Sequence, residues 1–161
     1  MTEDVSKKQA KILVERARKL QMDGEFADAI LLFRRSISLY PTADAFTFLG
    51  LTYAMMNRYQ EAIDSCKMAI EVDAEFGQPY NDIGAYLIRL NQWEEAVPWL
   101  EKAINAPNYQ ERQNPLMHLG RIYEHQGRYR TALNYYDKAL EIDPMNLVCT
   151  GVKYDLLGQL N

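Results

Sequence analysis

Residues 49–73 read LGLTYAMMNRYQEAIDSCKMAIEVD. This stretch has a glycine at position 50, an asparagine at 57, an aromatic residue at 59 and an alanine at 62. The same order of residue types recurs along the chain, and the matching alanines are separated by 33, 34 and 36 residues. These alanines are Ala29, Ala62, Ala96 and Ala132. A regular period of this length is typical of an array in which each unit packs against its neighbours.

A second column of the repeat indicates the shape of each unit. It holds glycine or asparagine, which tolerate the left-handed backbone conformation that ends a helix. Its members are Gly24, Asn57, Asn91 and Gly127. A large aromatic residue follows two positions later, and these residues are Phe26, Tyr59, Trp93 and Tyr129. The pattern predicts a helix, a tight turn and a second helix in every unit, and Pro41 and Pro144 mark the ends of second helices.

Two more columns predict the core between the paired helices. Small residues recur where two helices must approach closely, so that large residues elsewhere can fill the space. The small residues are Ala17, Gly50, Gly84 and Gly120, each twelve positions before the alanine of its unit. The residues four positions after that alanine are Phe33, Cys66, Leu100 and Tyr136. We expect both sets to be buried.

The chain resembles the tetratricopeptide repeat family. The residues that carry the resemblance in the clearest unit are Leu49, Gly50, Tyr53, Tyr59, Ala62 and Ala69, and two later units match in the same register. The resemblance implies an all-α fold, a right-handed superhelical solenoid of four helical hairpins with a C-terminal capping helix. We expect one domain over residues 1–161, with repeats at about 10–42, 43–76, 77–110 and 113–146 and a capping helix at 147–160.

Two segments depart from the regular repeat. The junction at residues 105–115 is two residues longer than the others, so we expect it to shift the fourth hairpin or to display a loop. The capping helix is expected to cover the last hairpin with one apolar side. That side consists of Leu147, Val148, Val152, Leu156 and Leu157.

Composition excludes several classes of function. The net charge is −4, which argues against a nucleic-acid binder because phosphates are neutralised by clustered Lys and Arg. A small basic cluster near the N-terminus, which we interpret as a solvated helix face, consists of Lys7, Lys8, Lys11, Arg16, Arg18 and Lys19. Cys66 and Cys149 belong to no CxxC pair, which favours reduced thiols in a cytoplasmic protein. No apolar run reaches the ~18 residues that span a bilayer, so we expect no membrane partner.

Catalytic and metal-binding patterns are missing from the sequence. There is no glycine-rich phosphate loop, no GxSxG and no HExxH, so we expect neither an enzyme nor a cofactor. His118 and His125 are the only histidines. They would lie about 10 Å apart along one helix, which is too far for two ligands of one metal ion. We therefore expect no metal site.

The first helix of each unit is expected to line a concave groove, because stacked hairpins create such a surface. Helical spacing from the core columns selects the groove residues. In the second unit they are Thr47, Phe48, Leu51 and Met55. In the third they are Asn81, Asp82 and Arg89, and in the fourth Met117, His118, Arg121 and His125. Apolar residues with a polar rim on such a surface indicate recognition of a partner.

Some members of the family grip the C-terminal carboxylate of heat-shock chaperones with Lys, Asn and Arg side chains on this surface. The corresponding positions here include Phe48 and Asp82, so heat-shock tails are not the expected ligand. The leading hypothesis is an adaptor or scaffold that binds a peptide or helical segment of another protein. The alternatives are a chaperone for a secreted or assembled client and a self-assembling homo-oligomer.

Overall fold

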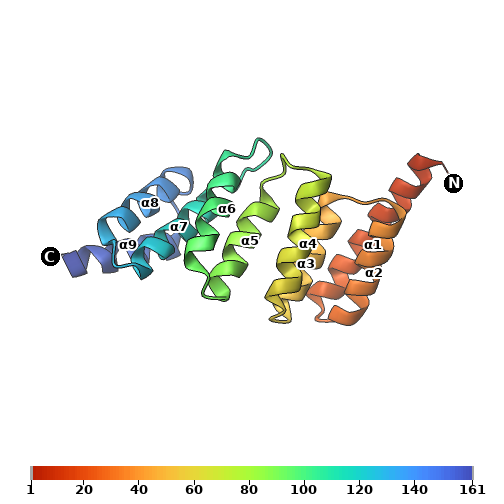
Figure 1. Ribbon diagram of the computed structural model, residues 1–161, viewed down its shortest axis with the longest axis horizontal. Coiled ribbons are helices and arrows are strands. Elements are labelled where there is room, and N and C mark those ends of the chain that lie inside the picture. Colours follow the sequence, from red (N-terminus) through yellow and green to blue (C-terminus); the bar gives the residue numbers. More distant parts are fainter. Residues whose placement is uncertain (1, 161) are drawn as a thin grey trace.

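A computed structural model describes residues 2–160 of the chain. This part forms nine helices that follow one another in an elongated array (Figure 1). Their bounds are α1 Glu3–Met22, α2 Phe26–Leu39, α3 Ala43–Met55, α4 Tyr59–Val72, α5 Gln78–Arg89, α6 Trp93–Asn105, α7 Gln113–His125, α8 Tyr129–Ile142 and α9 Leu147–Leu160. The predicted all-α solenoid of four hairpins and a terminal helix is confirmed.

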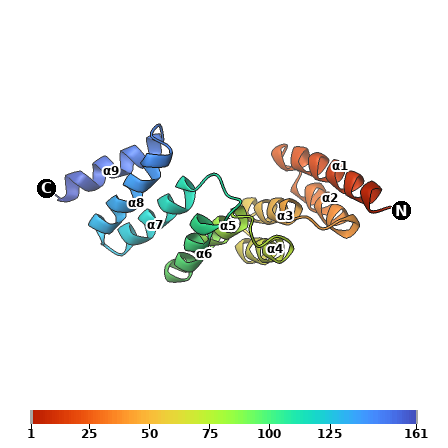
Figure 2. The same ribbon diagram turned by 90° about the horizontal axis from the view of Figure 1, so that it is seen from above.

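The hairpins are α1–α2, α3–α4, α5–α6 and α7–α8, and each packs on the next (Figure 2). The first helices α1, α3, α5 and α7 also contact one another in succession, so they form a continuous layer. We call the face of this layer that points away from the second helices the first-helix surface. The predicted groove residues were assigned to this face, and its role in binding stays a prediction.

Each hairpin turns where the sequence predicts. Positive φ angles occur at Gly24 (82°), Asn57 (60°), Asn91 (59°) and Gly127 (72°). In every hairpin three residues separate the two helices. The amide of the residue after the positive φ angle donates back to the end of the first helix. The backbone N–H of Arg58, for example, donates to the carbonyl oxygen of Tyr53 at 2.9 Å. The aromatic residue that follows therefore always begins the second helix.

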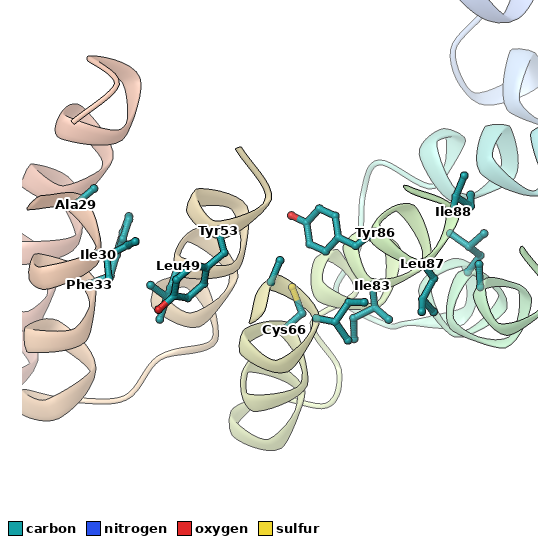
Figure 3. Packing of buried hydrophobic residues seen from close by; sticks show 14 of the residues in the cluster. Ala29, Ile30, Phe33, Leu49, Tyr53, Cys66, Ile83, Tyr86, Leu87 and Ile88 are labelled. Atoms are coloured by element: carbon teal, nitrogen blue, oxygen red, sulfur yellow. The ribbon is translucent and has the colours of Figure 1, made fainter. Parts of the chain in front are cut away.

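The predicted core columns are buried. Ala29, Ala62, Ala96 and Ala132 are fully buried, as are Phe33, Cys66 and Leu100, and Tyr136 is only 1% exposed. Those of the first three hairpins belong to one cluster that extends to Leu119 and Ile122 on α7 (Figure 3), and Ala132 and Tyr136 belong to a second cluster. Sterics explain why glycine occupies the small-residue column. A Cβ atom on Gly84, for example, would lie 2.4 Å from Leu100 Cδ2.

The longer junction between the third and fourth hairpins is anchored on the preceding junction. Phe76 and Asn108 form an isolated parallel bridge. The Gly77 amide donates to the Asn108 carbonyl oxygen at 3.1 Å, and the Asn108 amide donates to the Glu75 carbonyl oxygen at 3.0 Å. The side chain of Tyr109 is 5% exposed and fills the space beside Gly77. The extra residues thus form a packed connection between two inter-hairpin loops.

The predicted packing side of the terminal helix α9 is correct only in part, since Leu156 is buried and Val152 packs against the same cluster. Cys149 and Leu156 are its buried residues. The predicted contact residues Leu147, Val148 and Leu157 are instead 82%, 68% and 38% exposed. Apolar residues lie on every side of α9, so helical spacing could not select the side that packs. An exposed ion pair between Lys153 Nζ and Asp137 Oδ1 at 2.6 Å links α9 to α8.

Candidate functional site

The predicted groove residues lie on α3, α5 and α7, but they differ in their access to solvent. Leu51, Met55, Arg89, Arg121 and His125 are exposed. Phe48, Asp82, Met117 and His118 are partly buried, and Thr47 and Asn81 are buried. The exposed apolar residues of the set are the pair on α3. Leu51 is 39% exposed and Met55 is 47% exposed.

Two of the predicted residues on α3 serve the fold. The Thr47 hydroxyl donates to the carbonyl oxygen of Ala43 at 2.8 Å, so it is satisfied within its own helix. The Phe48 ring stacks on Phe33 with 6.2 Å between centroids, and the Arg18 guanidinium lies 4.4 Å from the Phe48 centroid. Phe48 therefore joins the first hairpin to the second and presents only part of its ring to the surface.

Arg89 and His125 occupy equivalent positions at the ends of α5 and α7, and both contact the preceding hairpin. Arg89 Nε donates to the Tyr59 hydroxyl at 3.0 Å. The His125 ring stacks on Trp93, with 4.0 Å between centroids and 11° between planes. We expected these side chains to face the groove. In the structure each packs on the aromatic residue that begins the previous second helix, which helical spacing within one helix cannot reveal.

The polar residues at the start of α5 form a small hydrogen-bonded group. Gln78 Nε2 donates to Asp82 Oδ1 at 2.8 Å, and Asn81 Nδ2 approaches the same oxygen at 3.5 Å. The buried Asn81 Oδ1 has no hydrogen-bond partner. Burial raises the pKa of the Asp82 carboxyl to about 6, and the nearby charge of Glu111 contributes to this rise. Asp82 is therefore a carboxylate held in an unfavourable environment.

His118 on α7 occupies the position equivalent to Asp82 on α5. Its Nδ1 atom is buried without a hydrogen-bond partner. Burial, followed by the charge of Arg121, lowers the pKa of the imidazole to about 4. His118 is therefore neutral at pH 7. Next to it, Met117 accepts a weak hydrogen bond from Asn146 Nδ2 at 3.4 Å, which links α7 to the segment before α9.

A cleft of about 420 Å³ opens between the N-terminal halves of α1 and α3. Its lining includes Lys7, Lys8, Lys11, Val14 and Asp44. The three lysines belong to the basic cluster that was expected to be a solvated helix face. Their positions at i, i+1 and i+4 on α1 place them beside the second hairpin, which could be recognised only once the packing of α1 against α3 was known.

Other kinds of site have little support. Between residues 2 and 160 no group of three or more His, Cys, Asp and Glu side chains could hold a metal ion. None of the helices in that part of the chain is long and apolar enough to cross a membrane. Cys66 and Cys149 are free and buried.

Comparison with known proteins agrees with this geometry. Sequence profiles of the tetratricopeptide repeat match residues 43–76 and 115–146, and residues 80–106. These matches together cover more than half of the sequence, and the chain belongs to the tetratricopeptide repeat family. The small glutamine-rich tetratricopeptide repeat-containing protein 2 of Mycosarcoma maydis is 26% identical over 105 residues, which are 65% of this chain and 29% of that protein. The chain spans less than a third of the length of the curated relatives it matches.

Solved structures show the same fold at low sequence identity. PilF of Pseudomonas aeruginosa superimposes with a TM-score of 0.87 at 20% identity, covering 98% of this chain and 70% of PilF. YrrB, described as a tetratricopeptide repeat protein with an unusual peptide-binding site, has a TM-score of 0.67 at 23% identity and covers 89% of this chain and 75% of its own. These similarities establish the architecture.

Proposed function

We propose that this chain is a protein-interaction module that holds a peptide or helical segment of a partner on its first-helix surface. The observation that carries the proposal is the exposed apolar pair Leu51 and Met55 on α3, in the middle of a layer of first helices. A solvated helix face has no need of two adjacent apolar side chains one turn apart. The peptide-binding site of the structural relative YrrB gives the proposal further support.

The surface around this pair has the mixed character of a recognition site. Arg18 lies over the Phe48 ring on one side, and the partly buried Asp82 lies on the next first helix. An apolar centre supplies binding energy when water is displaced, and a polar rim fixes the register of the bound segment. The function that fits is that of an adaptor or scaffold without catalysis. A chaperone that holds one apolar client would use the same surface.

We also propose a cytoplasmic location for the chain. Both cysteines are free and buried, and neither is paired in a disulfide. Disulfides are common in oxidising compartments and rare in the cytoplasm, so two unpaired thiols favour the reducing compartment.

The proposal predicts that Leu51→Asp weakens partner binding by about tenfold or more, because a carboxylate replaces an apolar contact at the centre of the surface. Binding is measured by capture on the tagged full chain from a lysate of the native host, followed by quantitative mass spectrometry. The matched control is Met68→Asp on the second helix α4, since Met68 is 43% exposed and Leu51 is 39% exposed.

Partners that Met68→Asp retains and Leu51→Asp loses would support the first-helix surface as the binding site. Circular dichroism must show the same helical content in both variants. If Leu51→Asp captures the same partners as the unmodified chain in the same amounts, the proposed surface is wrong.

A further inference from the structure

Four polar groups gather where α5 begins and the longer junction passes it. They are the side chains of Asn81, Asp82, Tyr109 and Glu111, and we call them the acceptor site. Asn81 and Tyr109 are both 5% exposed, yet Asn81 Oδ1 and the Tyr109 hydroxyl have no hydrogen-bond partner. Buried polar atoms are normally satisfied, and an unsatisfied one costs free energy unless something else pairs with it.

Three side-chain amides of the chain donate to this site. Asn114 Nδ2 donates to Glu111 Oε2 at 3.1 Å. Gln78 and Asn81 both direct their amide groups to the same oxygen of Asp82, Oδ1. The other carboxylate oxygen, Oδ2, receives no hydrogen bond from residues 2–160. A carboxylate can accept about four hydrogen bonds, so half of the capacity of Asp82 is unused.

The site also lacks a positive charge. The ion pairs of the described part of the chain are Lys8–Asp4, Arg58–Glu61 and Lys153–Asp137, and none includes Asp82 or Glu111. Arg112 is adjacent to Glu111 in sequence, but its guanidinium donates to the carbonyl oxygens of Ile104 and Ala106 at 2.9 and 2.8 Å. Two carboxylates thus lie near each other without a cation, and this raises the pKa of Asp82 beyond the effect of its burial.

The chemical class of the ligand follows from the lack of a donor to Asp82 Oδ2 and the lack of a cation at the site. The ligand must bring a positive charge and several hydrogen-bond donors, and it must reach a partly buried carboxylate from the first-helix surface. A divalent metal ion is disfavoured, because no group of three His, Cys, Asp or Glu side chains surrounds a common point within residues 2–160. A lysine ammonium has three donors and an arginine guanidinium has five, each on a long apolar stem that can enter a narrow site.

We propose that the acceptor site binds a lysine or arginine side chain of the partner segment held on the first-helix surface. This inference rests on the proposed function, and it adds the chemical class of the partner. The carboxylate of Asp82 pairs with the cation through its free oxygen Oδ2, beside the buried Asn81 amide. The apolar residues of the same segment then lie toward Leu51 and Met55 on α3.

The test begins with a random dodecapeptide display library selected on the immobilised full chain. Selected peptides are synthesised, and their affinities are measured by fluorescence anisotropy for the unmodified chain and for Asp82→Asn. In each peptide the basic residue is then replaced by its uncharged counterpart, norleucine for lysine or citrulline for arginine. The matched control is Asp64→Asn, because Asp64 on α4 accepts from Gln60 Nε2 at 3.2 Å, just as Asp82 accepts from Gln78.

The expected result is a basic residue at a fixed position of the selected peptides. Removing its charge weakens binding to the unmodified chain and to Asp64→Asn by about tenfold or more, as for other close charge pairs in interfaces. The same replacement in the peptide changes its affinity for Asp82→Asn by less than about threefold, because this variant lacks the carboxylate charge with which the basic residue pairs.

Selected peptides that lack a basic residue, or that bind equally to the unmodified chain and Asp82→Asn, would overturn the inference and leave the proposed function intact. The proposed function has a separate readout, since peptides held on the first-helix surface must lose affinity for Leu51→Asp. A library that yields no peptide, or only peptides indifferent to Leu51→Asp, contradicts the proposed function and this inference with it.

Discussion

Gly120→Ala is expected to lower the free energy of unfolding by about 1–3 kcal/mol, although alanine is the better helix former. A Cβ atom at this position would lie 2.7 Å from Tyr136 Cε1 and 2.8 Å from Tyr136 Cζ. The ring cannot move away easily, because it is only 1% exposed and its hydroxyl donates to Glu124 Oε2 at 2.9 Å. The methyl group would therefore push α7 and α8 apart or break this hydrogen bond.

Urea unfolding followed by circular dichroism measures this loss. Gly151→Ala is the matched control, because Gly151 also lies within a helix and a Cβ atom there would meet nothing within 4 Å. This control should gain about 0.5–1 kcal/mol from the higher helix propensity of alanine. Equal gains for both variants would show that the glycine column is not required for close packing of the paired helices.

Asp82→Asn is expected to stabilise the protein by about 1–3 kcal/mol at pH 7. The pKa of Asp82 is raised to about 6 from an ordinary value of 3.8, so the folded chain holds this proton more tightly than the unfolded chain does. One pKa unit corresponds to about 1.4 kcal/mol. The charged carboxylate thus destabilises the fold, fully above pH 6 and progressively less as the pH falls toward 4.

The measurement is the difference in unfolding free energy between the variant and the unmodified chain from pH 7.5 to pH 4. The difference should shrink toward zero as the pH falls. Taking the difference cancels the opposite effect of His118, whose lowered pKa makes the folded state lose stability below about pH 6.5 in both proteins. A variant that is no more stable at pH 7, or a difference that grows in acid, would contradict this account of Asp82.

The effect of Asp82→Asn on stability and its effect on peptide binding together define the role of Asp82. If the charged Asp82 lowers stability at neutral pH and its replacement also weakens binding of basic peptides, Asp82 behaves as a binding residue that is retained at a cost in stability. If Asp82→Asn stabilises the chain without affecting peptide binding, the buried carboxylate is only a strained part of the fold.

The hairpins could be predicted from the sequence because each is specified locally. The glycine or asparagine in the turn, the aromatic residue two positions later and the buried alanine all act within one unit, and the period repeats them. The packing of α9 could not be predicted in this way. Its apolar residues surround the helix, and the contact with Tyr136 and Asp137 on α8 decides which side is buried.

The candidate site was predictable only in part. The helical register selected Leu51 and Met55, which are exposed, and Asp82 on the next first helix, and their role in binding stays a prediction. It could not show that Arg89 contacts Tyr59, because these residues are 30 positions apart in different hairpins. Tyr109 was missed as well, since it belongs to a junction without helical period and is positioned by Gly77 and the bridge between two loops.

The most direct test of the central claim is a methyl NMR spectrum of the full chain labelled at its methionine methyl groups, with and without a captured partner. Met55 and Met117 lie on first helices, whereas Met68 lies on the second helix α4 and Met145 lies between α8 and α9. Binding on the first-helix surface predicts that the signals of Met55 and Met117 shift and those of Met68 and Met145 stay in place. Shifts confined to Met68 or Met145 would contradict the claim.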